Sequence, residues 1–312
     1  MRFATVSSSI DVLFFAPVAS AALAGLACLA GLLILFVRRR ALGGTTLLAP
    51  WAWSVVALVA VAGAEIVVGL DASLPLNWRM GLRYAAAMAT FTPIMALLGA
   101  KRPQDRGWQF IVLSLWAILA LPSFEWLLFG EIKELHPARL WFLLILVGVG
   151  AANGVGTRRW LSSVCYAAGQ GALMAPFLST TVAALPDSSA PLVGLALIAA
   201  SYALPMRARD AQVNAEGLNR AWLDFRDAYG LVWSLRVAER MNASAAMYSW
   251  PVQLGWQGFH NREPSSGPVV APAAVEESLR TLLRRFVSAA WIDARIDNTR
   301  VPGAKAMSEP IG

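Results

Sequence analysis

The chain contains the stretch VLFFAPVASAALAGLACLAGLLILFV at residues 12–37, which carries no charged side chain and is followed directly by Arg38, Arg39 and Arg40. A helix needs about 20 apolar residues to cross the roughly 30 Å hydrocarbon core of a bilayer. The apolar part of a secretory signal peptide has only about 7–15 residues. The stretch therefore predicts a membrane-spanning helix that ends at a basic loop.

Further apolar stretches of similar character fill the first two thirds of the chain. With the first one they cover residues 12–37, 47–70, 80–100, 107–130, 139–156, 160–182 and 189–206. Hydrophobic residues make up 57% of the chain and charged residues 14%, whereas charged residues are about a quarter of an average soluble domain. We therefore expect an all-α fold, a polytopic bundle of seven transmembrane helices.

The charges between these stretches predict an orientation. Basic residues gather on one side of the expected zigzag: Arg38, Arg39, Arg40, Lys101, Arg102, Arg106, Arg158, Arg159, Arg207 and Arg209. The opposite connections hold the acidic residues Asp71, Glu131, Glu134 and Asp187. Because cytoplasmic loops carry an excess of Lys and Arg, this bias places the N-terminus outside and the C-terminal region in the cytoplasm. Topology thus accounts for the net charge of +7, and the Arg-rich, Lys-poor usage favours a bacterial inner (cytoplasmic) membrane.

Three ionisable residues lie inside the expected spans, away from their ends: Glu65, Arg83 and Glu125. At 1.5 Å per residue all three fall at about the same depth below the outer surface, with Tyr84 and Trp126 beside them. Charged groups in hydrocarbon are costly and usually pair or face water. We expect a cluster with Arg83 between the two carboxylates, which acts either as a clamp between helices or as a ligand-binding site that opens outward.

The composition changes after Arg209, where charged residues begin to alternate with aromatic ones. We expect a transmembrane domain at residues 1–209, a small cytoplasmic helical unit at 210–300 and a disordered tail at 301–312. Apolar residues at three- and four-residue steps predict helices at about 213–241 and 274–296. Between them, residues 248–259 are too apolar for a free linker, and we expect an ordered loop.

Aromatic side chains are unusually frequent in this cytoplasmic unit. The candidates for a docking surface, toward a partner protein or the membrane, are Trp222, Phe225, Tyr229, Trp233, Trp250 and Trp256. A core between the two helices is the other interpretation, because an amphipathic helix must bury its apolar face. From Arg207 onward 13 basic residues face 11 acidic ones, a balance that argues against a nucleic-acid partner.

Several chemistries lack the residues they need. The two histidines, His136 and His260, fall outside the expected spans, so haem ligation by two histidines within the bundle is excluded. Both cysteines, Cys28 and Cys165, fall within apolar stretches and predict neither a disulfide nor a thiolate metal site. Motifs for zinc proteases, nucleotide binding and serine hydrolases are missing from the sequence. We expect no metal, no cofactor and no enzymatic activity.

Two functions remain for such a chain. The first is a non-catalytic subunit, assembly factor or scaffold of a larger membrane complex, in which the bundle sits in the lipid bilayer and the cytoplasmic aromatic helix docks a protein partner. The alternative is a transporter of a small molecule or lipid, with Glu65, Arg83 and Glu125 as its outward-facing site.

Overall fold

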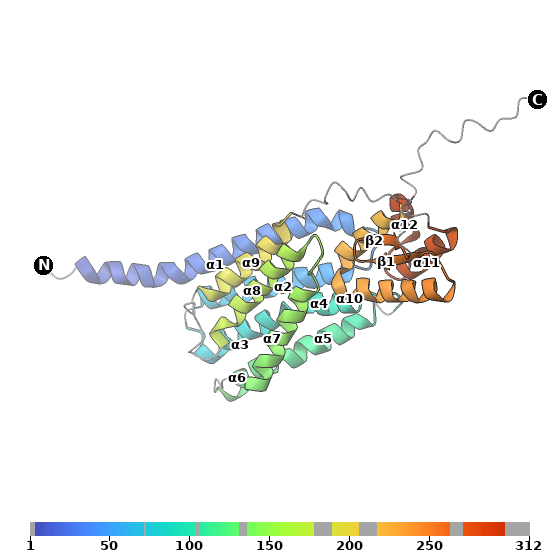
Figure 1. The fold of residues 1–312 in the computed structure, drawn as a ribbon. Coiled ribbons are helices and arrows are strands. Elements are labelled where there is room, and N and C mark those ends of the chain that lie inside the picture. The colour runs from blue at the N-terminus through green and yellow to red at the C-terminus, as the bar shows by residue number, and fades with distance from the viewer. Residues whose placement is uncertain are drawn as a thin grey trace, which may run out of the picture. The chain divides into compact units, whose positions relative to one another are not determined.

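The computed structural model describes residues 4–71, 73–103, 106–130, 136–177, 189–205, 217–262 and 271–296, with residues 4–17 described by their backbone alone. The described chain is mostly helical and divides into two compact units (Figure 1). The helical unit comprises Met1–Gly43 and Leu47–Met206, and the C-terminal unit comprises Arg207–Gly312 together with Gly44–Thr46. The expected tail at 301–312 and the basic residues Arg207 and Arg209 lie outside the described residues.

The helical unit consists of helices packed side by side. They are α1 (Ala4–Arg39), η1 (Arg40–Leu42), α2 (Leu48–Leu70), α3 (Leu76–Ala89), α4 (Thr92–Leu98), α5 (Trp108–Leu119), α6 (Leu121–Phe129), α7 (Pro137–Ala152), α8 (Trp160–Met174), η2 (Ala175–Phe177) and α9 (Ala190–Ala203). Helix α2 lies at the centre, in contact with α1, α3, α4 and α9, while α8 packs against α7 and α9.

Several of these helices are compatible with membrane spans. Within the described residues three segments are long and apolar enough to cross a bilayer: Val18–Leu42, Leu48–Leu70 and Leu76–Leu98. A fourth candidate is the pair α5 and α6, which is bent by 43° at Ala120. Helices α7 and α9 are apolar but shorter, so helix length and composition support three or four spans and not, by themselves, the expected seven.

The third expected span is broken between α3 and α4, at Thr90 and Phe91. Pro93 has no backbone N–H, so the carbonyl of Ala89 loses its helical donor. The hydroxyl of Thr92 donates to that carbonyl at 2.7 Å instead. The carbonyl of Thr90 accepts hydrogen bonds from two side chains of α8, Tyr166 at 2.7 Å and Gln170 at 3.2 Å. The break is thus completed by hydroxyl and amide donors, as backbone within apolar surroundings requires.

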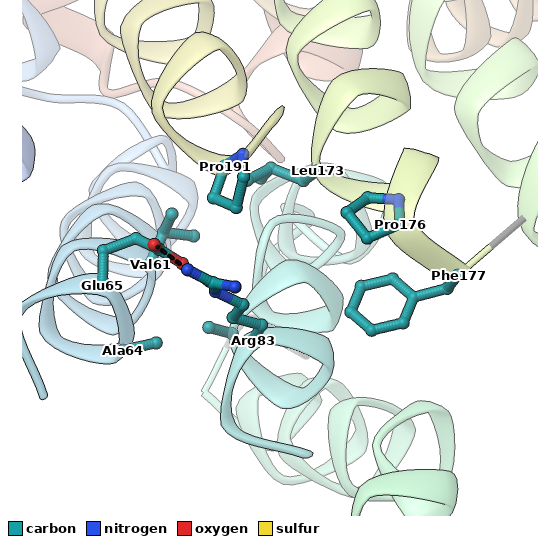
Figure 2. A pocket seen from close by; sticks show the side chains of 9 residues that line it. Val61, Ala64, Glu65, Arg83, Leu173, Pro176, Phe177 and Pro191 are labelled. Atoms are coloured by element: carbon teal, nitrogen blue, oxygen red, sulfur yellow. Dashed lines mark hydrogen bonds and ion pairs between the residues drawn. The ribbon is translucent and has the colours of Figure 1, made fainter. Parts of the chain in front are cut away.

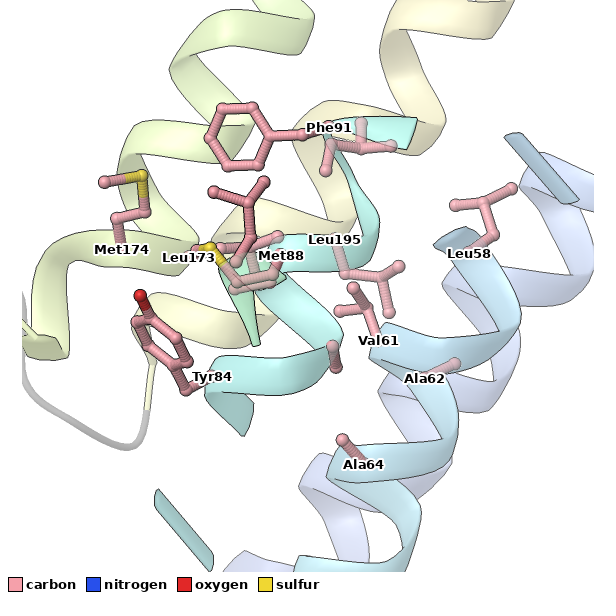
Figure 3. Packing of buried hydrophobic residues seen from close by; sticks show 14 of the residues in the cluster. Leu58, Val61, Ala62, Ala64, Tyr84, Met88, Phe91, Leu173, Met174 and Leu195 are labelled. Carbon is pink, nitrogen blue, oxygen red and sulfur yellow. The ribbon is translucent and has the colours of Figure 1, made fainter. Parts of the chain in front are cut away.

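The core of the helical unit lies where α2, α3, α8 and α9 meet (Figure 3). Leu58 and Val61 from α2 lie there with Met88 from α3, Leu173 from α8 and Leu195 from α9, all buried. Small residues allow the close approach of α8 and α9. A Cβ atom added at Gly169 would lie 2.9 Å from the carbonyl oxygen of Gly194, so the helix backbones are in direct contact there.

The part of the C-terminal unit that the structure describes contains three helices and a two-stranded sheet. Its described elements are α10 (Leu218–Met247), β1 (Val252–Gly255), β2 (Gly258–Asn261), α11 (Ala273–Leu283) and α12 (Ala289–Ile296). Strands β1 and β2 pair antiparallel, with Leu254 opposite Phe259. The expectation of an all-α chain is therefore wrong for this segment, where a β-hairpin replaces the ordered loop.

Both predicted cytoplasmic helices differ from those observed. Helix α10 extends to Met247 and is kinked at Gly230, whose φ of 78° lies in the region that glycine adopts most easily. The predicted helix 274–296 is interrupted at Arg284–Ser288, although no proline or glycine stands there. The interruption has a tertiary cause, because Phe286 turns into the core and Val287 pairs with another segment of the chain.

That segment is Gly44–Thr46, the connection between η1 and α2. It forms an antiparallel β-bridge in which Thr45 pairs with Val287. Thr46 N–H donates to the Phe286 carbonyl at 3.0 Å, and Ser288 N–H donates to the Gly44 carbonyl at 2.6 Å. A short piece of the N-terminal third is therefore part of the C-terminal unit, which the sequence did not indicate.

Candidate functional site

Glu65 of α2 and Arg83 of α3 form an ion pair inside the helical unit. Arg83 Nε donates to Glu65 Oε1 at 2.8 Å, and Arg83 Nη2 donates to Glu65 Oε2 at 2.8 Å, so both carboxylate oxygens are engaged. Figure 2 shows the two side chains pointing toward each other from neighbouring helices. The Glu65 side chain is 2% exposed and that of Arg83 is 18% exposed. Such two-point geometry partly compensates for the cost of removing both charges from water.

A small pocket lies at this pair, and Glu65 and Arg83 both line it (Figure 2). Leu173, Pro176 and Phe177 contribute from α8 and η2, and Pro191 contributes from α9. The centre of a water molecule can move through only about 10 Å³ of it. That is close to the minimum for holding one water, so the pocket in this conformation has no room for an organic solute.

The third member of the expected cluster lies elsewhere. Glu125 on α6 is exposed, and within the described residues no hydrogen bond or ion pair joins it to Arg83. Residues Ser123 and Trp126 of the same helix are buried, so α6 turns a different face toward the core. The expected placement of Arg83 between two carboxylates is therefore wrong, because a common depth does not set the rotation of a helix.

The two aromatic residues expected beside the cluster do meet. Tyr84 and Trp126 pack edge to face with ring centroids 5.2 Å apart, and Phe177 packs on both, 5.0 Å from Tyr84 and 5.9 Å from Trp126. Tyr84 is fully buried. Phe177, which also lines the pocket, was missed at the sequence level because only the tertiary fold brings the end of α8 to α3 and α6.

Four of the six proposed docking aromatics lie in the interior of the C-terminal unit. Trp222, Phe225 and Tyr229 are completely buried, and Trp233 is 7% exposed. Phe286, from the turn between α11 and α12, lies 5.2 Å from Phe225, 5.3 Å from Tyr229 and 4.9 Å from Trp233, centroid to centroid. In this structure the four side chains form a core and are not available as a docking surface. This is the other interpretation of the pattern, in which the apolar face of the helix is buried within the unit.

The remaining two candidates lie nearer the surface. Trp256, at the tip of the β-hairpin, is partly exposed and sits under the guanidinium of Arg226 at 5.2 Å. Trp250 is also partly exposed and stacks on Tyr248 with ring centroids 5.6 Å apart. Tyr248 is 64% exposed and the adjacent Met247 is 76% exposed. We call Met247, Tyr248 and Trp250 the α10 edge.

Helix α10 holds the β-hairpin through its polar side chains. Asn242 makes two bonds to Leu254, one to its carbonyl at 3.0 Å and one from its N–H at 2.8 Å. Asn219 accepts the N–H of Phe259 at 2.7 Å. Arg226 is 5% exposed, pairs with Asp227 at 3.0 Å and donates to the Trp256 carbonyl at 2.7 Å. Arg226 thus connects α10 to the tip of the hairpin.

The described part of the chain offers little to a metal ion. It has no group of three or more His, Cys, Asp or Glu side chains close enough to share one. His136 caps the start of α7, where its Nδ1 accepts the N–H of Ala138 at 3.3 Å, and His260 is exposed on β2. Cys28 donates to the Leu58 carbonyl and Cys165 to the Leu197 carbonyl, each from within an apolar helix.

No protein-family model, no curated protein and no solved structure matches this chain. Two features of the chain bear on its function, the Glu65–Arg83 pair and the α10 edge.

Proposed function

We propose that the chain is a non-catalytic component of a bacterial inner-membrane complex, with seven transmembrane helices, an external N-terminus and a cytoplasmic C-terminal unit that docks a partner protein. The observation that carries the docking proposal is the α10 edge. The C-terminal unit buries Trp222, Phe225 and Tyr229 completely, yet leaves Met247 and Tyr248 on its surface.

The chemistry of the α10 edge favours a protein partner. Trp, Tyr and Arg are the residues that most often dominate the energy of protein interfaces. Arg262 lies next to this edge, because its N–H donates to the Pro251 carbonyl at 2.7 Å, one residue from Trp250. Arg262 and Arg240 are both exposed. We therefore expect a partner surface that offers an apolar pocket for the stacked rings and acidic side chains around it.

Chain connectivity supports an odd number of spans. Gly44–Thr46 follows the first proposed span and belongs to the same compact unit as the C-terminal residues. In the proposed topology the two segments therefore share one side of the membrane. An even number of crossings must then separate them. Helix α2, the pair α3–α4 and the bent pair α5–α6 supply three. An odd number is therefore needed from α7, α8 and α9.

The basic residues favour three further crossings over one. Arg158 and Arg159 stand between α7 and α8, and the positive-inside rule places them in the cytoplasm with Arg38 to Arg40. At 1.5 Å per residue α7, α8 and α9 are each about 21–24 Å long, somewhat less than the hydrocarbon thickness, a mismatch that local thinning of the bilayer accommodates. Seven spans satisfy both the charge pattern and the parity.

The topology is tested with single-cysteine variants labelled by a membrane-impermeant maleimide in intact cells. Ser73→Cys in the α2–α3 connection should react from outside, whereas Arg102→Cys and Gln257→Cys should react only after the membrane is permeabilised. Labelling of Gln257→Cys in intact cells would contradict the proposal.

The docking proposal is tested by purifying the tagged chain from its native membrane in mild detergent and identifying stoichiometric companions by mass spectrometry. Tyr248→Ala and Trp250→Ala should each lose the companion. Leu235→Ala, an exposed apolar residue elsewhere on α10, should retain it. A chain that purifies alone, or a companion that all three variants retain, would contradict docking at the α10 edge.

The second candidate function is transport of a small molecule or lipid, and the pocket beside Arg83 is the observation that favours it. Because that pocket holds at most about one water molecule, a carrier would have to open α8 and α9 away from α3. In proteoliposomes, Arg83→Lys should then reduce solute uptake while Glu125→Gln leaves it unchanged. Equal uptake by both variants and the native chain would exclude this site.

A further inference from the structure

Three residues from distant parts of the sequence form a buried hydrogen-bonded group in the C-terminal unit, which we call the clasp: Thr46, Tyr229 and Phe286. The Tyr229 hydroxyl donates to the Phe286 carbonyl at 2.8 Å. The same hydroxyl lies 3.1 Å from Thr46 Oγ1 and accepts the Thr46 N–H at 3.3 Å. Tyr229 is fully buried and Thr46 is 6% exposed, so water has little access to these bonds.

The clasp lies at the centre of the C-terminal unit. The ring of Phe286 packs against Phe225, Tyr229 and Trp233, which together form the aromatic core of α10. The kink at Gly230 directly follows Tyr229, so the clasp lies next to the point where the second half of α10 begins. The α10 edge is at the end of that second half.

The clasp brings together residues that are 183 positions apart in sequence, Thr46 and Tyr229. A free chain would lose considerable conformational entropy in closing such a loop. Here the segment Gly44–Thr46 is held at both ends, because η1 ends at Leu42 and α2 begins at Leu48, which leaves only Gly43 and Leu47 as connections. Once α1 and α2 are folded, this short connection has few conformations left to lose, which lowers the entropic cost of the clasp.

We propose that the clasp makes folding of the C-terminal unit conditional on the α1–α2 hairpin, so that the α10 edge becomes ordered only in a chain whose first two helices are correctly inserted. The part concerning docking rests on the proposed function; the dependence of the C-terminal unit on the hairpin does not. A partner that recognises the α10 edge would then select inserted chains over incomplete ones.

The proposal is tested by amide hydrogen exchange on the full chain in lipid nanodiscs, without any partner. Four flexible residues, Gly-Ser-Gly-Ser, are inserted between Leu42 and Gly43 to loosen the hold of the hairpin on the segment. The control has the same insertion between Ser73 and Leu74, in the connection between α2 and α3. A second variant, Tyr229→Phe, removes the hydroxyl of the clasp and keeps the ring.

We expect exchange at the amides of Thr46 and Ser288 to rise at least about 10-fold in the Leu42–Gly43 insertion and in Tyr229→Phe, with a parallel rise over the last two turns of α10. The control insertion should leave all these amides unchanged. Unchanged exchange at Thr46 and Ser288 in the Leu42–Gly43 insertion would overturn the dependence on the hairpin. Faster exchange at Thr46 and Ser288 with unchanged exchange in the last two turns of α10 would overturn the link to the α10 edge.

A disulfide gives an independent check. Thr45 and Val287 form a non-hydrogen-bonded antiparallel pair, because the backbone hydrogen bonds are made by the residues on either side of them. The Cα atoms of such pairs are about 4.5 Å apart, which is within the range of a disulfide. Thr45→Cys with Val287→Cys should form a disulfide and restore protection in the Leu42–Gly43 insertion. Failure of the disulfide to restore it would overturn the proposal. Because no partner enters these measurements, a failed search for a companion leaves their outcome unaffected.

Discussion

Arg83 holds both carboxylate oxygens of Glu65, each at 2.8 Å, across the contact between α3 and α2. Glu65 is 2% exposed, and Arg83 is the cation with which its carboxylate pairs. The pair therefore stabilises the helical unit only as long as both partners are present. Removing one partner should lower the free energy of unfolding much more than removing both.

Replacing Arg83 alone should strongly destabilise the helical unit. Arg83→Gln leaves an uncompensated buried carboxylate, and breaking such a pair costs about 3–5 kcal/mol of unfolding free energy. The double variant Glu65→Gln with Arg83→Gln removes both charges and should recover most of that loss. Unfolding by denaturant in mixed micelles measures the unfolding free energy of the single and the double variant. Equal stabilities of the single and double variants would show that the pair is hydrated and not a clamp.

Replacing Glu125 should change stability little. Its side chain is exposed on α6 and, among the described residues, forms no hydrogen bond or ion pair with Arg83. Glu125→Gln should therefore lie within about 0.5 kcal/mol of the native chain in the same unfolding measurement. A loss comparable to that of Arg83→Gln would mean that Glu125 belongs to the cluster after all.

The hydroxyl of Thr92 should be needed at the break between α3 and α4. Thr92→Val keeps the shape of the side chain but leaves the Ala89 carbonyl without its 2.7 Å donor in a fully buried position. An unsatisfied buried acceptor costs about 1–3 kcal/mol. Thr92→Ser retains the hydroxyl and should be milder. Thermal unfolding followed by circular dichroism compares them, and indistinguishable melting of Thr92→Val and the native chain would refute this assignment.

Asn242 should determine how firmly the β-hairpin is attached. Asn242→Ala removes both bonds to Leu254, one of 3.0 Å and one of 2.8 Å, and should cost about 1–3 kcal/mol locally. Limited proteolysis between β1 and β2 should accelerate correspondingly. Gln253→Ala, an exposed position on β1, is the matched control and should cleave at the native rate. Equal cleavage of the two variants would contradict the role of Asn242.

Asp71, at the end of α2, gives a prediction for pH. The Ser73 hydroxyl donates to its carboxylate at 2.6 Å and the Ser73 N–H at 3.0 Å, and these bonds hold the pKa of Asp71 below its ordinary 3.8. Because the folded pKa is the lower one, the turn is stabilised above pH 3.8 and loses this contribution as the pH falls through the folded value. Ser73→Ala should raise the pKa of Asp71 toward 3.8, as measured by carboxyl carbon NMR; an unchanged pKa would contradict this cause.

Apolar stretches determined much of what the sequence could predict about the fold. The uncharged stretch from Val12 to Val37 has a local consequence, since the length of an apolar stretch by itself decides whether it can cross a bilayer. The Glu65–Arg83 pair was also predictable, because a buried charge requires an opposite one. The span count of seven and the orientation stay predictions.

Tertiary contacts decided the rest. The rotation of α6 that exposes Glu125, the turn at Arg284–Ser288 that carries Phe286 inward, and the choice of core over docking surface for Trp222 and Tyr229 all depend on residues distant in sequence. The clearest case is Gly44–Thr46, whose own sequence is an ordinary loop between two apolar helices. Only folding of the whole chain brings Phe286 and Tyr229 to it, because hydrogen bonds and burial over such separations are properties of the packed structure and have no local signal.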